Sequence, residues 1–177
     1  MTKHERAPDG EWAALPLDLL CDRLVAGPHA AVHAAVPRIR ARLATIAERS
    51  PGVETDAVRQ AFTAAADLLL AHLAKEENIL FPALSALADA ERGGRPRPPL
   101  AFPTVLHPIR LLETEHARVA AALDDLQALA ARHPDAATDA WRPVIEDLAA
   151  LGRTLRAHAR LEVDVLFPRA LELDRRV

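Results

Sequence analysis

The sequence predicts an all-α protein, an antiparallel up-and-down four-helix bundle whose long helices are kinked. Its 177 residues include 38 Ala and 27 Leu but no Tyr, a composition that favours helices over sheets. Clusters of Pro and Gly interrupt the chain at only three places and leave four long segments. Within each segment apolar residues recur at spacings of three and four, as expected of an amphipathic helix. Four such helices with short or moderate connections favour a bundle.

The first expected helix spans about residues 15–49, and the second spans about 54–90 after a break at 50–52. Gly27-Pro28 is expected to kink the first helix rather than to split it. The apolar stripe of the first helix consists of Val25, Val32, Val36, Ile39 and Leu43. The stripe of the second consists of Val58, Phe62, Ala65, Leu69, Ile79 and Ala83.

The third expected helix spans about residues 105–132, after the Pro-rich stretch 93–103, and the fourth spans about 138–174. The third stripe consists of Ile109, Leu112, Val119, Leu123 and Leu126. The fourth stripe consists of Val144, Leu148, Leu151, Leu155 and Val165. Four prolines fall inside the helical patterns and should bend the helices that carry them: Pro37, Pro82, Pro143 and Pro168.

Length, composition and charge limit the classes of protein to which this chain can belong. We expect one domain, a helical bundle over residues 15–177, preceded by a short polar N-terminal tail over 1–14. A net charge of −3 argues against nucleic acid or an anionic membrane as partner. No leader and no apolar run of membrane-spanning length is visible, so we expect a cytoplasmic protein, a monomer or weak dimer. The single Cys21 excludes an internal disulfide and a cysteine-based metal cage within one chain.

Each apolar stripe has a gap, and a histidine occupies each gap. These histidines are His29, His72, His116 and His158, and all four fall near the middle of their helices. Glu76 and Glu162 follow four residues after the second and fourth of them, on the same helix faces. Burying an unpaired carboxylate in an apolar core is costly, and two would be buried here. The sequence therefore predicts that four imidazoles and two carboxylates meet at one level of the bundle.

The same residues form an internal repeat. His72, Glu76 and the triplet Leu80-Phe81-Pro82 have the same spacing as His158, Glu162 and the triplet Leu166-Phe167-Pro168. An upstream histidine precedes each repeat at a similar distance, His29 in the first half of the chain and His116 in the second. The chain therefore consists of two similar helical hairpins.

Four imidazoles and two carboxylates are the ligand set of a pair of borderline metal ions, with iron as the first candidate. If Glu76 and Glu162 bridge two iron ions and an oxo or hydroxo group joins them, each iron retains one open position. Nitric oxide, O₂ or peroxide would bind there. His33 lies on the same helix face as His29, so it is the alternative ligand from the first helix. The spacing of the apolar stripe favours His29.

The sequence resembles the hemerythrin-like domain of the RIC (repair of iron centres) family. The members of this family are bacterial di-iron proteins linked to nitrosative and oxidative stress. The matching stretches are PHAAVHAAVPRI, HLAKEENILFPAL, PIRLLETEHARV and HARLEVDVLFPRAL. The ligands of that family map onto His29, His72, Glu76, His116, His158 and Glu162. Hemerythrin proper fits less well, because it has a second histidine four residues away on the third helix, where this chain has Leu112 and Ala120.

The resemblance implies two related functions. The protein would supply iron to damaged clusters of iron–sulfur client proteins, or it would bind and reduce nitric oxide as a di-iron oxidoreductase. Glu115 matches an acidic residue of the family, which implies a proton relay; a solvated helix residue is the alternative. Val163-Asp164 replaces the polar Asn pair expected after the last ligand, which weakens hydrogen bonding around the site. A different class of function is a module that binds O₂ or nitric oxide reversibly and acts as a sensor.

Overall fold

A computed structural model describes residues 12–177, and the regular elements among them are all helical. The elements form four helical runs, and in three of them a five-residue π-helical segment (η) separates two α-helices. The first run contains α2 (Leu17–Leu24), η1 (Val25–His29) and α3 (Ala30–Arg49). The second contains α4 (Val53–Lys75), η2 (Glu76–Leu80) and α5 (Phe81–Arg92), and the third is α6 (Leu106–Ala131). The fourth, like the first and second, has three parts: α7 (Arg142–Leu161), η3 (Glu162–Leu166) and α8 (Phe167–Arg176).

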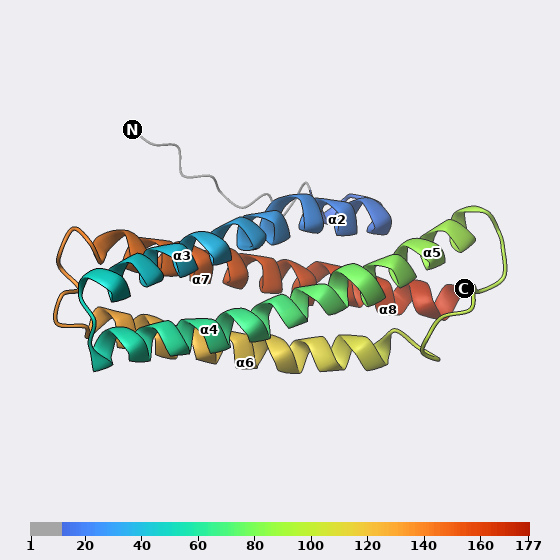
Figure 1. Ribbon diagram of the computed structural model, residues 1–177. Coiled ribbons are helices and arrows are strands. Elements are labelled where there is room, and N and C mark those ends of the chain that lie inside the picture. The colour runs from blue at the N-terminus through green and yellow to red at the C-terminus, as the bar shows by residue number, and fades with distance from the viewer. Residues whose placement is uncertain (1–11) are drawn as a thin grey trace, which may run out of the picture.

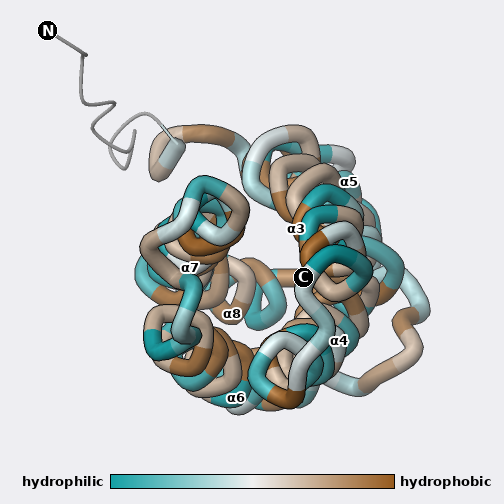
Figure 2. Tube along the Cα trace, turned by 60° about the vertical axis from the view of Figure 1, so that its left-hand side comes forward, coloured by the Kyte–Doolittle hydropathy of each residue, from teal (hydrophilic) through white to brown (hydrophobic). Residues whose placement is uncertain are grey.

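The four runs form the predicted four-helix bundle. Helix α3 packs against α4 and α7, and α6 packs against both α4 and α7. At the other end of the bundle α5 contacts α2 and α8. Consecutive runs travel in opposite directions (Figure 1), and the four surround a common interior in the end-on view (Figure 2). The predicted fold class, an antiparallel up-and-down bundle, is therefore confirmed.

Three of the predicted kinks coincide with the π-helical segments. Pro28 lies inside η1, so the first helical run continues through it as expected. Pro82 and Pro168 are the second residues of α5 and α8, directly after η2 and η3. In a regular α-helix a proline lacks one backbone donor and its ring clashes with the carbonyl four residues earlier. A wider π turn before the proline accommodates both effects.

The other two prolines do not coincide with π-helical segments. Pro143 lies in the first turn of α7, where a proline is well tolerated because its missing N–H would have no partner in the helix, so it marks a helix start and not a bend. Pro37 lies within α3, and the α-helix continues through it from residue 30 to 49. The predicted bend is therefore wrong at Pro143, whereas at Pro37 the proline does not interrupt the helix.

The apolar core is divided into two clusters by a polar layer. One cluster fills the end formed by α3, α4, the second half of α6 and the first half of α7, with Phe62 and Trp141 among its largest members. The other fills the end formed by α2, α5, α8 and the first half of α6, with Phe81 and Phe167 among its members. Cys21 belongs to the second cluster, where burial raises the pKa of its thiol to about 12. The histidines of the stripe gaps lie between the two clusters along every run.

The long connection between α5 and α6 is fixed to the last helix. Asp174 of α8 accepts hydrogen bonds from the Thr104 hydroxyl at 2.7 Å and from the Val105 amide at 3.2 Å, and it pairs with Arg97.

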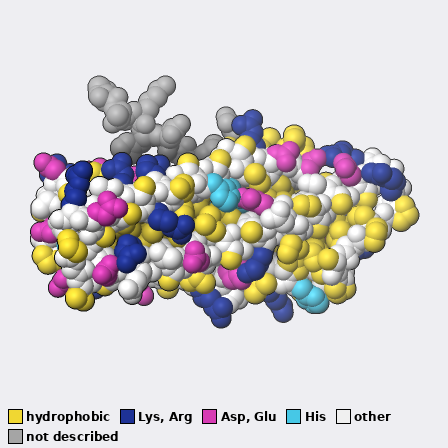
Figure 3. All heavy atoms as spheres, in the orientation of Figure 1, with side chains coloured by type: hydrophobic (Ala, Val, Ile, Leu, Met, Phe, Trp, Pro, Cys, Tyr) yellow, Lys and Arg dark blue, Asp and Glu magenta, His cyan; other side chains and the backbone are white. Residues whose placement is uncertain are grey.

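Charged side chains of both signs are interspersed over the face drawn in Figure 3. Among residues 12–177 we find no helix with the length and apolar character needed to cross a membrane.

Candidate metal centre

The six residues expected to be ligands meet in the polar layer and form two overlapping groups. His29 and His158 lie in one group, and His72 and His116 lie in the other. Glu76 and Glu162 belong to both, and within each group the candidate ligand atoms lie within 4.8 Å of one another. Five of the six residues are buried, and His116 is mostly buried. Sequence reasoning had placed the six at one level, and the structure adds how the histidines are paired.

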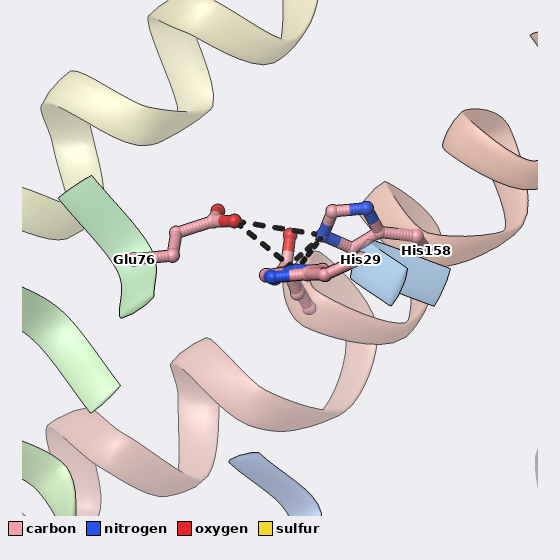
Figure 4. A group of neighbouring side chains, drawn as sticks. His29, Glu76 and His158 are labelled. Carbon is pink, nitrogen blue, oxygen red and sulfur yellow. Dashed lines mark hydrogen bonds and ion pairs between the residues drawn. The ribbon is translucent and has the colours of Figure 1, made fainter. Parts of the chain in front are cut away.

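In the first group the ligand atoms converge from three helical runs (Figure 4). The Nε2 atoms of His29 and His158 lie 3.2 Å apart. They lie 3.5 and 3.6 Å from Oε2 of Glu76. Oε1 of Glu162 lies 2.8 Å from Nε2 of His158.

The second group uses the other oxygen of each carboxylate. Oε1 of Glu76 lies 3.0 Å from Nε2 of His72 and 3.7 Å from Nε2 of His116. Oε2 of Glu162 lies 3.0 Å from Nε2 of His116. Each glutamate therefore presents one oxygen to each histidine pair, which is the arrangement of a carboxylate that bridges two cations.

The buried polar atoms of this layer fit metal ions better than they fit each other. All four carboxylate oxygens of Glu76 and Glu162 lack a partner with hydrogen-bond geometry, as does Nε2 of His72 and of His116. Buried polar atoms without partners are uncommon in proteins and call for an explanation. Nitrogen and oxygen ligands lie roughly 2.0–2.2 Å from a metal such as zinc, so neighbouring ligand atoms around one ion are about 3 Å apart. The separations seen here fit that geometry.

The electrostatics of the metal-free layer agree with this interpretation. Burial alone would lower the pKa of His116, but Glu162 and Glu76 raise it to about 9. For His158 burial again lowers the pKa, and the two carboxylates raise it to about 10. Despite its burial, Glu76 has a pKa well below its usual value because three histidines surround it. Protonated imidazoles therefore supply the positive charge that cations would supply in a loaded site.

His29 is distinguished from its alternative His33 by position. The side chain of His29 is fully buried, and its Nδ1 lies 2.8 Å from Oε1 of Glu77. Burial and the neighbouring His158 lower the pKa of His29, which favours the neutral ring that a ligand requires. The side chain of His33 is 48% exposed, and its Nε2 lies 3.1 Å from the same oxygen of Glu77. The structure thus brings His29 into the layer and leaves His33 outside it.

Glu77 is a site residue that sequence reasoning missed. It holds the outer nitrogen of His29, and such a hydrogen bond fixes the orientation of a ligand ring and raises its basicity. The only sequence signal was its position directly after Glu76.

Glu115 lies behind His72, on the side away from the carboxylates. Its Oε2 accepts a hydrogen bond from Nδ1 of His72 at 3.3 Å, and its Oε1 pairs with Lys75. Burial raises the pKa of Glu115, but hydrogen bonds from Lys75 and His72 lower it overall. Because it is bound on both sides, this carboxylate suits a role in orienting the His72 ring; the proton relay remains a prediction.

Comparison with known proteins gives two matching results. A family model described as the hemerythrin HHE cation binding domain matches residues 23–170. The chain is also similar to the iron-sulfur cluster repair protein YtfE from Salmonella paratyphi B, Salmonella newport and Salmonella agona. Each of these relatives is 27% identical over 173 residues, which cover 94% of this chain and 72% of the relative. The resemblance indicated by the four sequence stretches is confirmed.

Proposed function

The chain belongs to the hemerythrin HHE cation-binding domain family, and we propose that it is a non-haem di-iron protein of the iron–sulfur cluster repair type, protecting cells against nitrosative and oxidative stress. One observation carries the proposal. Two histidine pairs share both carboxylates, and each carboxylate offers one oxygen to each pair; this arrangement supports two cations rather than one.

The role of each residue follows from this arrangement. His29 and His158 would hold one iron, His72 and His116 the other, and Glu76 and Glu162 would bridge them. Neutral imidazoles with carboxylates suit iron among the borderline metals, and they leave room for a small ligand. When bound, the iron pair provides either iron for transfer or electrons for the reduction of nitric oxide. Glu77 and Glu115 keep the His29 and His72 rings in position.

Iron donation is the first of the two activities we propose. Damaged iron–sulfur proteins of the cytoplasm would be the clients, and the names of the similar Salmonella proteins support this choice. Carboxylate bridges suit a donor because protonation competes with metal for the same oxygens.

Nitric oxide binding and reduction is the second activity. A hollow of about 50 Å³ lies beside His72, His116 and His158, and its other walls are mainly apolar. A space of this size suits an uncharged diatomic molecule. The same observation supports the alternative function, a module that binds O₂ or nitric oxide reversibly and acts as a sensor.

Metal content tests the di-iron assignment directly. Protein reconstituted with ferrous iron under anaerobic conditions should hold about two irons per chain, because both histidine pairs are complete. Glu76→Leu and Glu162→Leu should each lower that content sharply, since each removes a shared ligand. Glu146→Leu, which removes an exposed carboxylate from α7, is the control and should keep the full content. Unchanged iron in both bridge variants would contradict the proposal.

The two activities are separated by one further experiment. The loaded protein is incubated anaerobically with an apo iron–sulfur protein, and iron transfer is followed; a second sample receives nitric oxide together with an excess of an electron donor. Iron transfer to the acceptor supports donation, and catalytic consumption of nitric oxide supports reduction. Stoichiometric, reversible binding of nitric oxide without either activity would support the sensor.

A further inference from the structure

The internal repeat makes the two halves of the site comparable position by position, and they differ in their outer hydrogen bonds. Glu77 follows the bridging Glu76 and holds Nδ1 of His29. The counterpart of Glu77 in the second hairpin is Val163, which follows Glu162 and cannot accept a hydrogen bond. Nδ1 of His116, the counterpart of His29, consequently has no hydrogen-bond partner.

The other two histidines show the same kind of difference. Glu115 precedes His116 and holds Nδ1 of His72. The counterpart of Glu115 is Pro28, and Nδ1 of His158 has no partner. Each histidine pair therefore contains one ring held by a carboxylate and one ring without such support.

Access to solvent distinguishes the two unsupported rings. The side chain of His158 is 1% exposed, whereas that of His116 is 13% exposed. His116 also borders an open surface hollow of about 420 Å³ between α6 and the junction of α7 with η3. Its lining consists of Glu113, His116, Ala159, Arg160, Val163 and Asp164. His116 is thus the ligand candidate that is both unsupported and in contact with the surface.

We propose that the two metal positions are inequivalent. The ion held by His72 and His116 enters and leaves through the hollow beside His116, and the ion held by His29 and His158 is retained. This inference rests on the di-iron function proposed above and assigns the transferable iron to one half of the site.

The physical reason is the cost of releasing each ion. A ligand must rotate away before its ion can leave, and His116 can turn into the hollow without breaking a hydrogen bond on Nδ1. His29 cannot turn without losing its bond to Glu77, and its side chain is fully buried. Outer hydrogen bonds of this kind are commonly worth about 10–100-fold in metal affinity. Glu113 and Asp164 line the same hollow and offer carboxylate oxygens to a departing cation.

Release kinetics of the ferrous protein provide the test. Excess ferrous chelator is added anaerobically, and the chelate is followed with time; we expect a fast and a slow phase of one iron each. Val163→Glu gives the second hairpin a carboxylate at the position where the first hairpin has Glu77. If this carboxylate holds Nδ1 of His116, it should slow the fast phase about tenfold or more and leave the slow phase unchanged. Leu111→Glu adds the same charge to an exposed position of α6 and is the matched control; it should change neither phase.

Two further variants assign the phases to the histidine pairs. Glu115→Gln weakens the support of His72 and should accelerate only the fast phase. Glu77→Gln weakens the support of His29 and should accelerate only the slow phase. Release of both irons in one phase, slowing of the slow phase by Val163→Glu, or acceleration of the fast phase by Glu77→Gln would overturn the inference. Protein that never holds two irons would instead contradict the di-iron function itself.

Discussion

His29 and His33 lie one turn apart on the first helical run, and only His29 reaches the shared carboxylates. His33 contacts the site through Glu77 alone and is half exposed to solvent. We expect His29→Ala to lose at least one iron per chain, because it removes a buried ligand. His33→Ala should keep both irons. Iron analysis after anaerobic reconstitution measures this, and loss of iron in the His33 variant alone would reverse the assignment.

Removal of the metal leaves a layer of charges whose balance depends on pH. In the metal-free protein His116 and His158 have pKa values raised to about 9 and about 10, because Glu162 and Glu76 outweigh the effect of burial. A histidine has a pKa near 6.5 when unfolded, so its stabilising contribution is complete below about pH 6.5 and is lost as the pH rises through the folded value. Glu76 behaves oppositely, because its pKa is lowered in the folded protein. Its stabilising contribution is complete above the pKa of an unfolded glutamate and is lost as the pH falls through the lower folded value.

The melting temperature of the metal-free protein should therefore fall as the pH rises from neutrality to about 10. His158→Gln should show a shallower fall, since one of the two titrating rings is gone. The metal-loaded protein should show little of this loss, because its histidines are already neutral ligands. A metal-free melting temperature that rises over this range would contradict the charge arrangement. Thermal denaturation in matched buffers provides the measurement.

At the level of the elements, the π-helical segments connect the ligands with the prolines that follow them. Glu76 and Glu162 are the first residues of η2 and η3, and His29 is the last residue of η1. π-helical turns are often found at functional sites. Here each segment places a ligand candidate at the junction of the polar layer with the second apolar cluster. The Leu-Phe-Pro triplets complete these junctions, because Leu80, Phe81, Leu166 and Phe167 all pack into that cluster.

Pro82→Ala tests whether the proline is accommodated without strain. A proline in the interior of a regular helix costs about 3 kcal/mol or more, so its removal from such a helix would stabilise the protein by that amount. Because Pro82 is the second residue of α5, in the turn that follows η2, we expect the free energy of unfolding to change by less than about 1 kcal/mol. Ala122→Pro, in the uninterrupted helix α6, is the comparison and should lose about 3 kcal/mol or more. Urea unfolding of both variants gives the values.

At the level of the whole molecule, two apolar clusters flank a polar layer that suits metal binding. Each cluster draws on all four helical runs and needs no metal for its packing. The polar layer in turn contributes buried groups that lack partners, at a cost of about 1–3 kcal/mol for each unsatisfied group. The bundle should therefore fold without metal but gain stability from it.

Chelation under reducing conditions should lower the melting temperature by several degrees, because metal binds the folded state far better than the unfolded chain. Most of the far-ultraviolet helix signal should survive at room temperature, since the clusters remain. The Glu76→Leu variant serves as control: with a bridge removed, its melting temperature should respond less to the chelator. A melting curve of the original protein that does not move after verified metal removal would show that the layer is not a metal site.

The sequence by itself determined the four helical segments and the histidine and glutamate positions that interrupt their apolar stripes. Helical periodicity fixes which residues share a face of one helix, and interruptions such as His72 and Glu76 are visible in that pattern. The repeat added confirmation from within the chain, because the same spacing occurs at His158 and Glu162. Both signals are local, and each can be followed along a single helix.

Only the tertiary structure decided how the helices are rotated and aligned against one another. It pairs His29 with His158, gives each carboxylate oxygen to a different pair, and brings Glu77 to His29 across 48 positions of sequence. It also places His116 beside a surface hollow. These relations depend on side-chain packing between separate helices. The mid-helix positions of the histidines predicted their common level, but periodicity along one helix contains no information about its rotation relative to another or about which histidines pair.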